Sequence, residues 1–371
     1  MKILHTADLH LDSAFCASTP TEADARRREQ REVLKRIFAT AKENDCDMML
    51  IAGDLFDTVY VTPETAELCL SLFSDFGKPV VISPGNHDPY VRGSFYKTNL
   101  PENVYVFSST ELQYFDFPEL GVTVAGYAFT SQSLPTSPLA APAISRNNES
   151  VLLLCAHAEL DTPTSRYAPV MSADIRRHGF KYSALGHVHN IPKAAEDIRY
   201  CGFAQGRSFD ELGDGGVLIV KINENGSLDV TEHIVSEQRF LWEEILVDGL
   251  GDTSNIEHAV REKISTLLNG KKTHLRIELT GTTDIDPSPV ISAIKADDFP
   301  SLCSLRIIND TLCIPDIDFL RKDPSLRGEL YRVLEGKLMS DEPSERALAL
   351  RALRIGLAAI DGKEFTDGGR V

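Results

Sequence analysis

The sequence lacks the usual marks of a secreted or membrane-bound protein. Its seven cysteines are far apart and form no Cys-x-x-Cys pair, which argues against a disulfide framework and against a zinc knuckle. No apolar run approaches the length of a membrane span, and the apolar stretch at the N-terminus is too short for a secretory signal. We therefore expect a cytoplasmic protein with no membrane association.

Positive charge is also scarce. The 38 Lys and Arg residues are outnumbered by 55 Asp and Glu residues, and the difference of 38 − 55 gives a formal net charge of −17. Such a protein repels a polyanion such as DNA unless metal ions or a local basic patch reverse the field. Carboxylates that bind two divalent cations present a positive site to phosphate. The charge therefore argues against nucleic acid only for a protein without such a metal site.

Short apolar runs alternate with helical patterns from residue 1 to about residue 235. Most of the runs are too short for helices, and they predict strands over residues 2–6, 48–52, 79–83, 122–126, 151–156, 182–186, 217–222 and 228–234. Helical spacing predicts crossover helices over residues 21–44 and 62–73, and the strands that flank them should be parallel. This pattern indicates an α/β fold, with an α/β/α sandwich as its main domain.

The pattern starts again near residue 238 as a smaller α/β domain. It predicts strands over 241–247, 274–279 and 304–308, with helices over 256–268 and 289–295. Helical spacing continues to residue 360, and residues 361–371 are expected to be frayed. We therefore divide the chain into domains of residues 1–237 and 238–315 and a helical C-terminal segment of residues 316–371.

Five of the apolar runs lead directly into residues of the types that commonly bind metals. These residues are Asp8, His10, Asp54, Asn86, His87, His157, His187 and His189. Ligands of open α/β sheets gather at the carboxyl ends of the strands, so these dispersed residues should converge on one site. Within the pairs Asp8/His10 and His187/His189, the i, i+2 spacing directs both side chains to the same side of an extended segment.

Each of these residues has an ordinary structural explanation when it is taken singly. A lone histidine near a strand end is more often a satisfied polar group, and an aspartate there is more often a cap or turn residue. All eight together favour a metal site. Mixed Asp, Asn and His ligands without cysteine suit Mn²⁺, Fe²⁺ or Zn²⁺ better than Mg²⁺ or Ca²⁺, and manganese is our first choice.

The ordered set of motifs around these residues resembles that of a known family. Asp8-Leu9-His10, Gly53-Asp54-Leu55-Phe56-Asp57, Gly85-Asn86-His87-Asp88, His157 and Gly186-His187-Val188-His189 resemble the full signature of calcineurin-like metallophosphoesterases. The opening segment 5–12 and the Gly-Asp-Leu-Phe-Asp motif are similar to SbcD-type DNA repair nucleases, including a YhaO-like branch. The resemblance covers roughly residues 1–235.

This resemblance implies a DNA exonuclease, with endonuclease activity left open, that uses two divalent metal ions. It implies one metal held by Asp8, His10 and His189, a second held by Asn86, His157 and His187, and Asp54 bridging both. His87 would contact the scissile phosphate. By position alone, residues 238–315 would form a DNA-capping domain and residues 316–371 would bind an SMC-like, SbcC-type ATPase. The implied partners are therefore DNA, this ATPase and a second copy of the chain.

The sequence departs from the family pattern at two places. Asp57 stands where many nuclease relatives carry a histidine that assists the exonuclease step, and residues 200–207 differ from the usual Pro-Gly-Ser-Pro-Gln. A run of basic residues from Arg26 to Arg36 could contact phosphates, although such a run on a crossover helix is more often a solvated face. Two other functions stay open, namely a metallophosphatase or small-molecule phosphodiesterase, and a non-catalytic scaffold for the ATPase.

Overall fold

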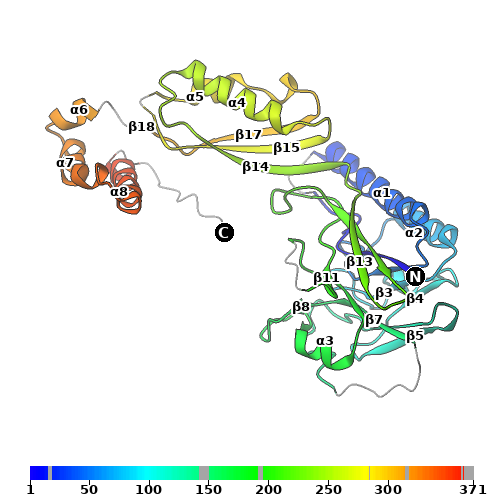
Figure 1. Ribbon diagram of the computed structural model, residues 1–371. Helices are drawn as coiled ribbons and strands as arrows, with labels where there is room; N and C mark the ends of the chain where they lie inside the picture. The colour runs from blue at the N-terminus through cyan, green and yellow to red at the C-terminus, as the bar shows by residue number, and fades with distance from the viewer. Residues whose placement is uncertain are drawn as a thin grey trace. The chain divides into compact units, whose positions relative to one another are not determined.

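The chain divides into two compact units, Met1–Phe240 and Leu241–Val371 (Figure 1). The computed structural model describes residues 1–15, 19–141, 150–190, 195–283, 285–313, 317–360 and 362. Most of the predicted frayed end, residues 361–371, lies outside these ranges. Among the helices of the described residues, none is long and apolar enough to cross a membrane.

The first unit is built on two sheets that contain the predicted strands. The larger has the order β13-β12-β1-β2-β3-β4. Its strands are β1 (Lys2–Thr6), β2 (Met48–Ile51), β3 (Val80–Ile82), β4 (Val104–Val106), β12 (Gly216–Ile222) and β13 (Leu228–Ile234). Strands β1 to β4 are parallel, as the crossover helices between β1, β2 and β3 require for those three, whereas β12 and β13 extend the sheet in antiparallel fashion.

The second sheet has the order β11-β10-β7-β6-β5. Its strands are β5 (Gln113–Phe117), β6 (Val122–Gly126), β7 (Val151–His157), β10 (Tyr182–Gly186) and β11 (Ile198–Tyr200). Only the edge strand β5 is antiparallel to its neighbour. Two short strands, β8 (Glu159–Leu160) and β9 (Pro169–Val170), pair beside this sheet's carboxyl end.

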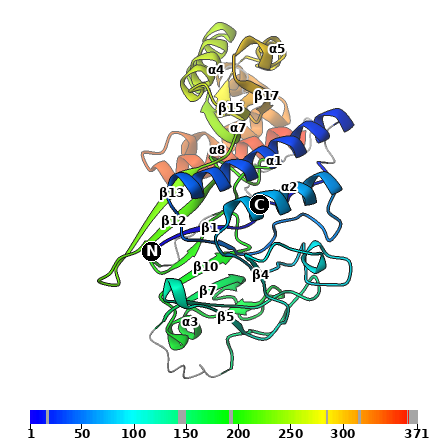
Figure 2. The same cartoon turned by 90° about the vertical axis from the view of Figure 1, so that its right-hand side faces the viewer.

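Helices cover the outer faces of both sheets (Figure 2). Helices α1 (Pro20–Glu43) and α2 (Pro63–Phe76) pack on the larger sheet, while α3 (Ser172–His178) packs on the other side of the unit. A further core of buried residues, which includes Leu50, Val81 and Tyr182, fills the space between the sheets. The predicted sandwich is confirmed, and its middle consists of two stacked sheets.

Local signals in the sequence place the first two helices. Thr19 caps α1 by accepting a hydrogen bond from the Glu22 backbone N–H, and the Glu22 side chain accepts one in return from the Thr19 N–H. Thr62 caps α2 by accepting a hydrogen bond from the Thr65 backbone N–H, and Gly77 ends this helix in the left-handed conformation. These caps fix where the chain enters and leaves the helices between β1, β2 and β3.

His5 connects the two sheets through their shared core. It lies on β1 with none of its surface exposed, and its Nδ1 is 2.9 Å from the Tyr182 hydroxyl, while its Nε2 is 3.1 Å from the Leu185 carbonyl oxygen. A neutral ring satisfies both contacts, because Nε2–H donates to the carbonyl and the hydroxyl donates to Nδ1. Burial lowers the pKa of His5 to about 4, despite opposing effects of Leu185 and Asp8.

The second unit has a three-stranded sheet of order β14-β15-β17. Its strands are β14 (Gln238–Leu246), β15 (Lys272–Thr280) and β17 (Leu302–Asn309), and helices α4 (Thr253–Leu267) and α5 (Ser288–Ala293) contribute to a core with Leu275 and Ile277. Two short strands, β16 (Thr282–Thr283) and β18 (Leu312–Cys313), also pair. The predicted alternation of strands and helices is therefore present, although the functional names given to these domains stay predictions.

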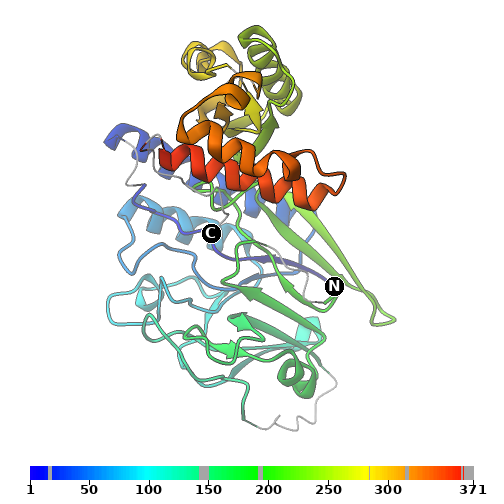
Figure 3. The same cartoon turned by 90° about the vertical axis from the view of Figure 1, so that its left-hand side faces the viewer.

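Three helices follow in the same unit, α6 (Ile317–Lys322), α7 (Leu326–Leu338) and α8 (Pro343–Ile360). Figure 3 shows α7 and α8 packed side by side, in orange and red. Their small core contains Leu320, Tyr331, Leu353 and Leu357. Helical spacing in the sequence thus predicts this segment correctly.

We expect His5 to make folding depend on pH. Its neutral form is favoured in the folded chain, so its contribution to stability is complete above the ordinary pKa of 6.5 and is lost as pH falls towards 4. The full loss is about 3 kcal/mol. Urea denaturation in EDTA between pH 7 and 4.5 should show a flatter pH dependence for His5→Gln than for the unmodified protein. Equal pH dependences would contradict this role.

Candidate metal centre

The ends of five strands bring all eight predicted site residues to one region of the first unit. Asp8 and His10 follow β1, Asp54 follows β2, and Asn86 and His87 follow β3 in the larger sheet. His157 is the last residue of β7, and His187 and His189 follow β10 in the second sheet. Since β1, β2 and β3 are parallel neighbours and β7 and β10 are another parallel pair, carboxyl ends from both sheets meet here.

Three groups of these side chains have ligand atoms within 4.8 Å of one another. The groups are Asp8, His10 and His189; Asp8, Asp54 and His157; and His10, Asp54 and His87. The first matches one predicted ligand set. Each group contains at least one carboxylate and one imidazole, so each could hold a divalent cation.

His10 and His189 face each other across the first group. Their Nε2 atoms are 3.3 Å apart, while His10 Nδ1 is 3.2 Å from Asp57 Oδ1 and His189 Nδ1 is 2.7 Å from Glu211 Oε1. Carboxylates accept hydrogen bonds, so each Nδ1 carries a proton. Burial lowers the pKa of His189, but its hydrogen bonds with Asp8 and Glu211 more than offset this and raise it to about 10. The space between the two Nε2 atoms therefore attracts positive charge, from a proton or from a metal.

His157 is fully buried and belongs to the second group. Its Nδ1 donates to the Ala52 carbonyl oxygen at 2.9 Å, and its Nε2 lies 2.9 Å from Asn86 Oδ1 and 3.2 Å from Asp54 Oδ2. Burial lowers the pKa of His157, but the charge and hydrogen bond of Asp54, with Asp8, more than offset this and raise it to about 9. This position therefore attracts positive charge, from a proton or from a metal.

Asp54 lies between the groups. It is 2 % exposed, its Oδ1 accepts a hydrogen bond from the His87 backbone N–H at 2.9 Å, and its Oδ2 also lies 3.8 Å from His10 Nε2. Burial raises the pKa of this carboxyl, but His157 and His10 hold it well below its usual range. An ionised carboxylate between two sets of imidazoles is the arrangement that a bridging ligand needs.

His187 is held beside the cluster by its backbone. Its N–H donates to both carboxylate oxygens of Asp8, at 3.1 and 3.0 Å, and its ring centroid lies 5.0 Å from that of His157 and 4.8 Å from that of Tyr167. Burial and the nearby His157 lower the pKa of His187 to about 4, so the ring is neutral and can serve as a ligand. It is in none of the three groups above.

His87 is the most exposed of the histidines in the cluster. Its side chain is 44 % exposed, and its Nδ1 donates to the Asp57 carbonyl oxygen at 3.1 Å, which leaves Nε2 free. A surface pocket beside the cluster is lined by His87, Asn86, residues 57–60, Gln132 and Tyr167. A second pocket contains His187, His189 and Arg207. His87 can therefore reach a molecule bound in the first pocket.

The backbone at the site adopts unusual conformations. Asp8, His10, Asp54 and His187 have φ angles of 53°, 45°, 49° and 103°, in the left-handed region that non-glycine residues seldom adopt. Such strain persists where the surrounding structure fixes it, and it gathers at functional sites. At Gly53 and Gly85, a Cβ would collide with the ring of His157 and the carboxylate of Asp54 respectively, so the approach of these loops requires glycine.

Several supporting residues were not predicted as part of the site. Asp88 is buried and accepts hydrogen bonds from the Phe56 and Gly85 N–H groups, at 3.1 and 2.8 Å, and from the Tyr96 hydroxyl at 2.6 Å. Burial and the charge of Asp54 raise the pKa of Asp88 to about 6. Asp88 was part of the quoted motif, whereas Glu211 gave no sequence signal because it stands in an ordinary polar segment.

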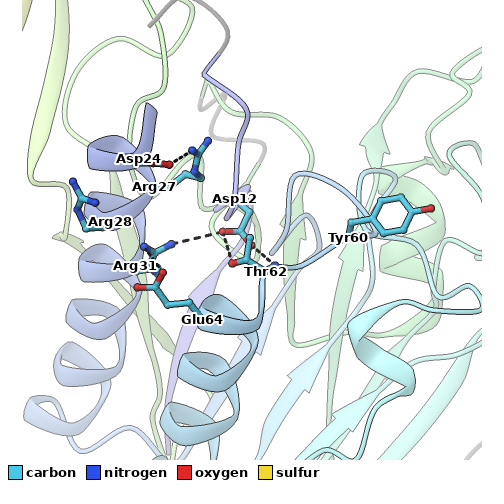
Figure 4. A pocket seen from close by; sticks show the side chains of 8 residues that line it. All are labelled: Asp12, Asp24, Arg27, Arg28, Arg31, Tyr60, Thr62 and Glu64. Carbon is cyan, nitrogen blue, oxygen red and sulfur yellow. Dashed lines mark hydrogen bonds and ion pairs between the residues drawn. The ribbon is translucent and has the colours of Figure 1, made fainter. Parts of the chain in front are cut away.

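Most of the basic run on α1 has partners within the protein. Arg31 pairs with Glu64 at 3.0 Å and lies 3.8 Å from Asp12, and Arg27 pairs with Asp24 (Figure 4). These residues line a surface pocket together with Arg28, Tyr60 and Thr62. The pairs explain these arginines without a bound phosphate.

Comparisons with known proteins agree with this geometry. The model of the family described as calcineurin-like phosphoesterase matches residues 1–190. The chain is 29% identical over 262 residues to the metallophosphoesterase YhaO of Bacillus subtilis, which covers 67% of this chain and 63% of that protein. It is 35% identical over 143 residues to the SbcD subunit of the nuclease SbcCD of the same organism, which covers 36% of this chain and 35% of that protein. The matches thus span less than two thirds of the length of either relative.

A comparison of two glycines tests how tightly the site is packed. Gly53 and Gly93 have φ angles of 91° and 88°, but only at Gly53 would a Cβ collide with His157. Gly93→Ala should cost roughly 1–2 kcal/mol through its backbone alone. Gly53→Ala should cost more and should weaken binding of a divalent metal about tenfold or more, because His157 must move. Urea denaturation and calorimetry measure both effects, and equal behaviour of the two variants would contradict the packing argument.

Proposed function

Because this chain belongs to the calcineurin-like phosphoesterase family, we propose that it is a metal-dependent DNA nuclease that hydrolyses phosphodiester bonds in DNA repair or end processing. The observation that carries the hydrolytic part is the convergence of the three ligand groups on Asp8 and Asp54. The similarity to the SbcD subunit of the nuclease SbcCD supports DNA as the substrate.

The residues of the cluster fit two divalent cations. We assign one to Asp8, His10 and His189, a second to Asn86, His157 and His187, and a bridging role to Asp54. The support for the first set is the pair of Nε2 atoms of His10 and His189 that point at each other. For the second, His157 Nε2 and Asn86 Oδ1 approach to 2.9 Å while the Nδ1 proton of His157 is held by Ala52. Manganese is our choice of metal because the donor set mixes imidazole, amide and carboxylate groups.

When bound, such cations lower the pKa of water and offset the negative charge of a phosphate. The protein supplies the fixed geometry. The N–H groups of His187 and His87 donate to Asp8 and Asp54 and thereby fix these carboxylates. Carboxylates held in this way need little rearrangement during the reaction, which is the main source of electrostatic stabilisation in enzymes.

His87 is suited to act on the phosphate itself. Its Nδ1 proton is committed to the Asp57 carbonyl oxygen, so only Nε2 is available to the substrate. In its cationic form, the ring presents an N–H that can stabilise charge on a phosphoryl oxygen or protonate the leaving oxygen. Both roles require the exposed position that His87 has at the edge of the pocket.

The helices at the end of the chain offer a surface for a partner. On α7, Leu326 and Val333 are 68% and 70% exposed, and on α8, Leu348 and Ile355 are 68% and 43% exposed. Residues seven apart lie on one face of a helix, so each helix exposes two apolar side chains on one face, which we call its apolar stripe. A partner that covers both stripes would bury these side chains. We infer that they bind the coiled coil of an SbcC-type ATPase.

Hydrolysis assays with purified protein and Mn²⁺ test the function. The substrates are linear duplex, hairpin and single-stranded DNA, together with bis(p-nitrophenyl) phosphate as a generic phosphodiester and p-nitrophenyl phosphate as a monoester. Asp54→Asn serves as the inactive control. We expect cleavage of DNA. Cleavage of the small esters alone would indicate a metallophosphatase or small-molecule phosphodiesterase, and binding of metal without any hydrolysis would indicate a scaffold.

For His87→Ala, we expect both metals to stay bound while turnover falls about 10²-fold or more, the scale for loss of a positioned acid or charge stabiliser. If His87 only stabilised its turn, thermal stability would fall while the rate per folded molecule stayed nearly constant. Metal content by elemental analysis, melting temperature and hydrolysis rate should be measured on the same variant. Near-normal turnover with two metals bound removes His87 from the mechanism.

We expect the double variant Leu326→Glu/Val333→Glu to lose association with the ATPase while hydrolysis of bis(p-nitrophenyl) phosphate is unchanged. Two charges placed on the stripe of α7 would have to be buried without partners at the interface. Ile234→Glu is the matched control, because Ile234 is 59% exposed on β13 in the first unit. Size-exclusion chromatography of the mixed proteins measures association. Equal association of the two variants would place the interface elsewhere.

A further inference from the structure

One side chain, Arg207, connects the supports of two candidate ligands. His10 and His189 each direct Nδ1 away from the cluster, His10 to Asp57 Oδ1 and His189 to Glu211 Oε1. Arg207 donates from Nη1 to the same oxygen of Asp57, at 3.2 Å, and from Nη2 to the same oxygen of Glu211, at 2.7 Å. One guanidinium thus fixes the position of both oxygens that orient the histidines.

The contact of Arg207 with Glu211 is more extensive than a single ion pair. Arg207 Nε lies 3.1 and 3.3 Å from the two carboxylate oxygens of Glu211, and its backbone N–H donates to Oε2 at 2.7 Å. The Glu211 side chain is only 5% exposed. Burial raises the pKa of Glu211, but His189 and Arg207 lower it to about 2, so the carboxylate stays ionised.

Arg207 is itself held by a second arginine from α1. Arg26 Nη2 donates to the Arg207 carbonyl oxygen at 2.7 Å, and the Arg26 guanidinium lies over the ring of Phe15, 4.2 Å from its centroid. The Arg207 side chain is 23% exposed, so its ion pairs with Asp57 and Glu211 are partly shielded from water, and they keep a better defined geometry than most pairs on an open surface. Arg207 is therefore held both at its backbone carbonyl and at its guanidinium group.

We propose that Arg207 is a positioning residue that orients His10 and His189 towards a shared divalent cation by holding Asp57 and Glu211. This inference rests on the proposed function, since it concerns one of the two metals assigned there. Carboxylates behind metal-bound histidines set the ring orientation and increase the basicity of the ligand, and their loss lowers metal affinity 10- to 100-fold. The inference also gives Asp57 a role that differs from the histidine of many nuclease relatives.

Arg207→Lys separates the geometry of the guanidinium from its charge. Lysine keeps the positive charge but cannot hold two carboxylates with a planar fork. We expect Mn²⁺ affinity to fall about 10- to 100-fold at one of two sites in calorimetric titration, with the other site unchanged. A general loss of protein stability would weaken Mn²⁺ binding at both sites. A loss of affinity at one site alone therefore indicates that Arg207 positions the ligands of that site. Arg28→Lys on α1 is the control.

Glu211→Gln provides an independent variant, because it removes the charge that Arg207 and His189 share. It should weaken the same site, and adding Arg207→Lys to it should have less than the additive effect, since both changes disturb one network. Two unchanged Mn²⁺ affinities in folded Arg207→Lys would overturn the inference while leaving the proposed function intact. If the unmodified protein bound no Mn²⁺, both the metal assignment and this inference would be wrong.

Discussion

The rest of the site depends on one constraint, which is the burial of two carboxylates beside the imidazoles of His10, His87, His157 and His189. Asp8 and Asp54 are 1% and 2% exposed, and removal of an isolated carboxylate from water is very costly. The protein compensates with backbone N–H groups from His87 and His187 and with the imidazoles of His157 and His189. These imidazoles in turn direct lone pairs or protons into the same space. Bound cations would satisfy both kinds of group at once, so the electrostatics of the fold and of the proposed chemistry are linked.

The same constraint explains the strained backbone. The ligands lie at or just after the ends of five strands of two sheets, and the backbone turns sharply within two residues of the ends of β1, β2 and β10. Asp8, His10 and Asp54 adopt left-handed φ angles there, and Gly53 allows its loop to lie against the ring of His157. Each such conformation costs of order 1–3 kcal/mol. The buried sheets beneath can offset that cost because their strands are continuous and apolar.

Much of the fold could be predicted from the sequence, because the spacing of apolar residues and the length of each apolar run are local signals. The runs at residues 2–6, 122–126 and 182–186 correspond to complete strands, and the pairs Thr19-Pro20 and Thr62-Pro63 mark the starts of α1 and α2. The convergence of the eight site residues could also be predicted, because ligands of open α/β sheets gather at the carboxyl ends of the strands. The split of the middle layer into two sheets could not be predicted, because it depends on which strands pair across long distances in sequence.

The roles of the supporting residues Asp57, Arg207 and Glu211 could not be predicted from the sequence, for a different reason. Asp57 could be recognised only as a departure from the family pattern. Its role depends on Arg207, which is 150 residues away in sequence and contacts Asp57 at 3.2 Å. Glu211 is four residues from Arg207, and the turn between them lets Glu211 contact both Arg207 and His189. Such roles depend on three-dimensional distances that no local spacing encodes.

The electrostatics of the surface limit how a polyanion could be attracted to this protein. The chain carries a net charge of −17, and Arg26, Arg31 and Arg36 on α1 donate to or pair with groups of the protein itself. Under the proposed function, the cations of the cluster would supply an attraction for phosphate that these arginines do not. Attraction of that kind acts over a short range, since charges are screened beyond about 8 Å at physiological ionic strength. Recognition would then begin where the phosphate meets His87 and the ligand cluster, so binding and chemistry would depend on the same few side chains.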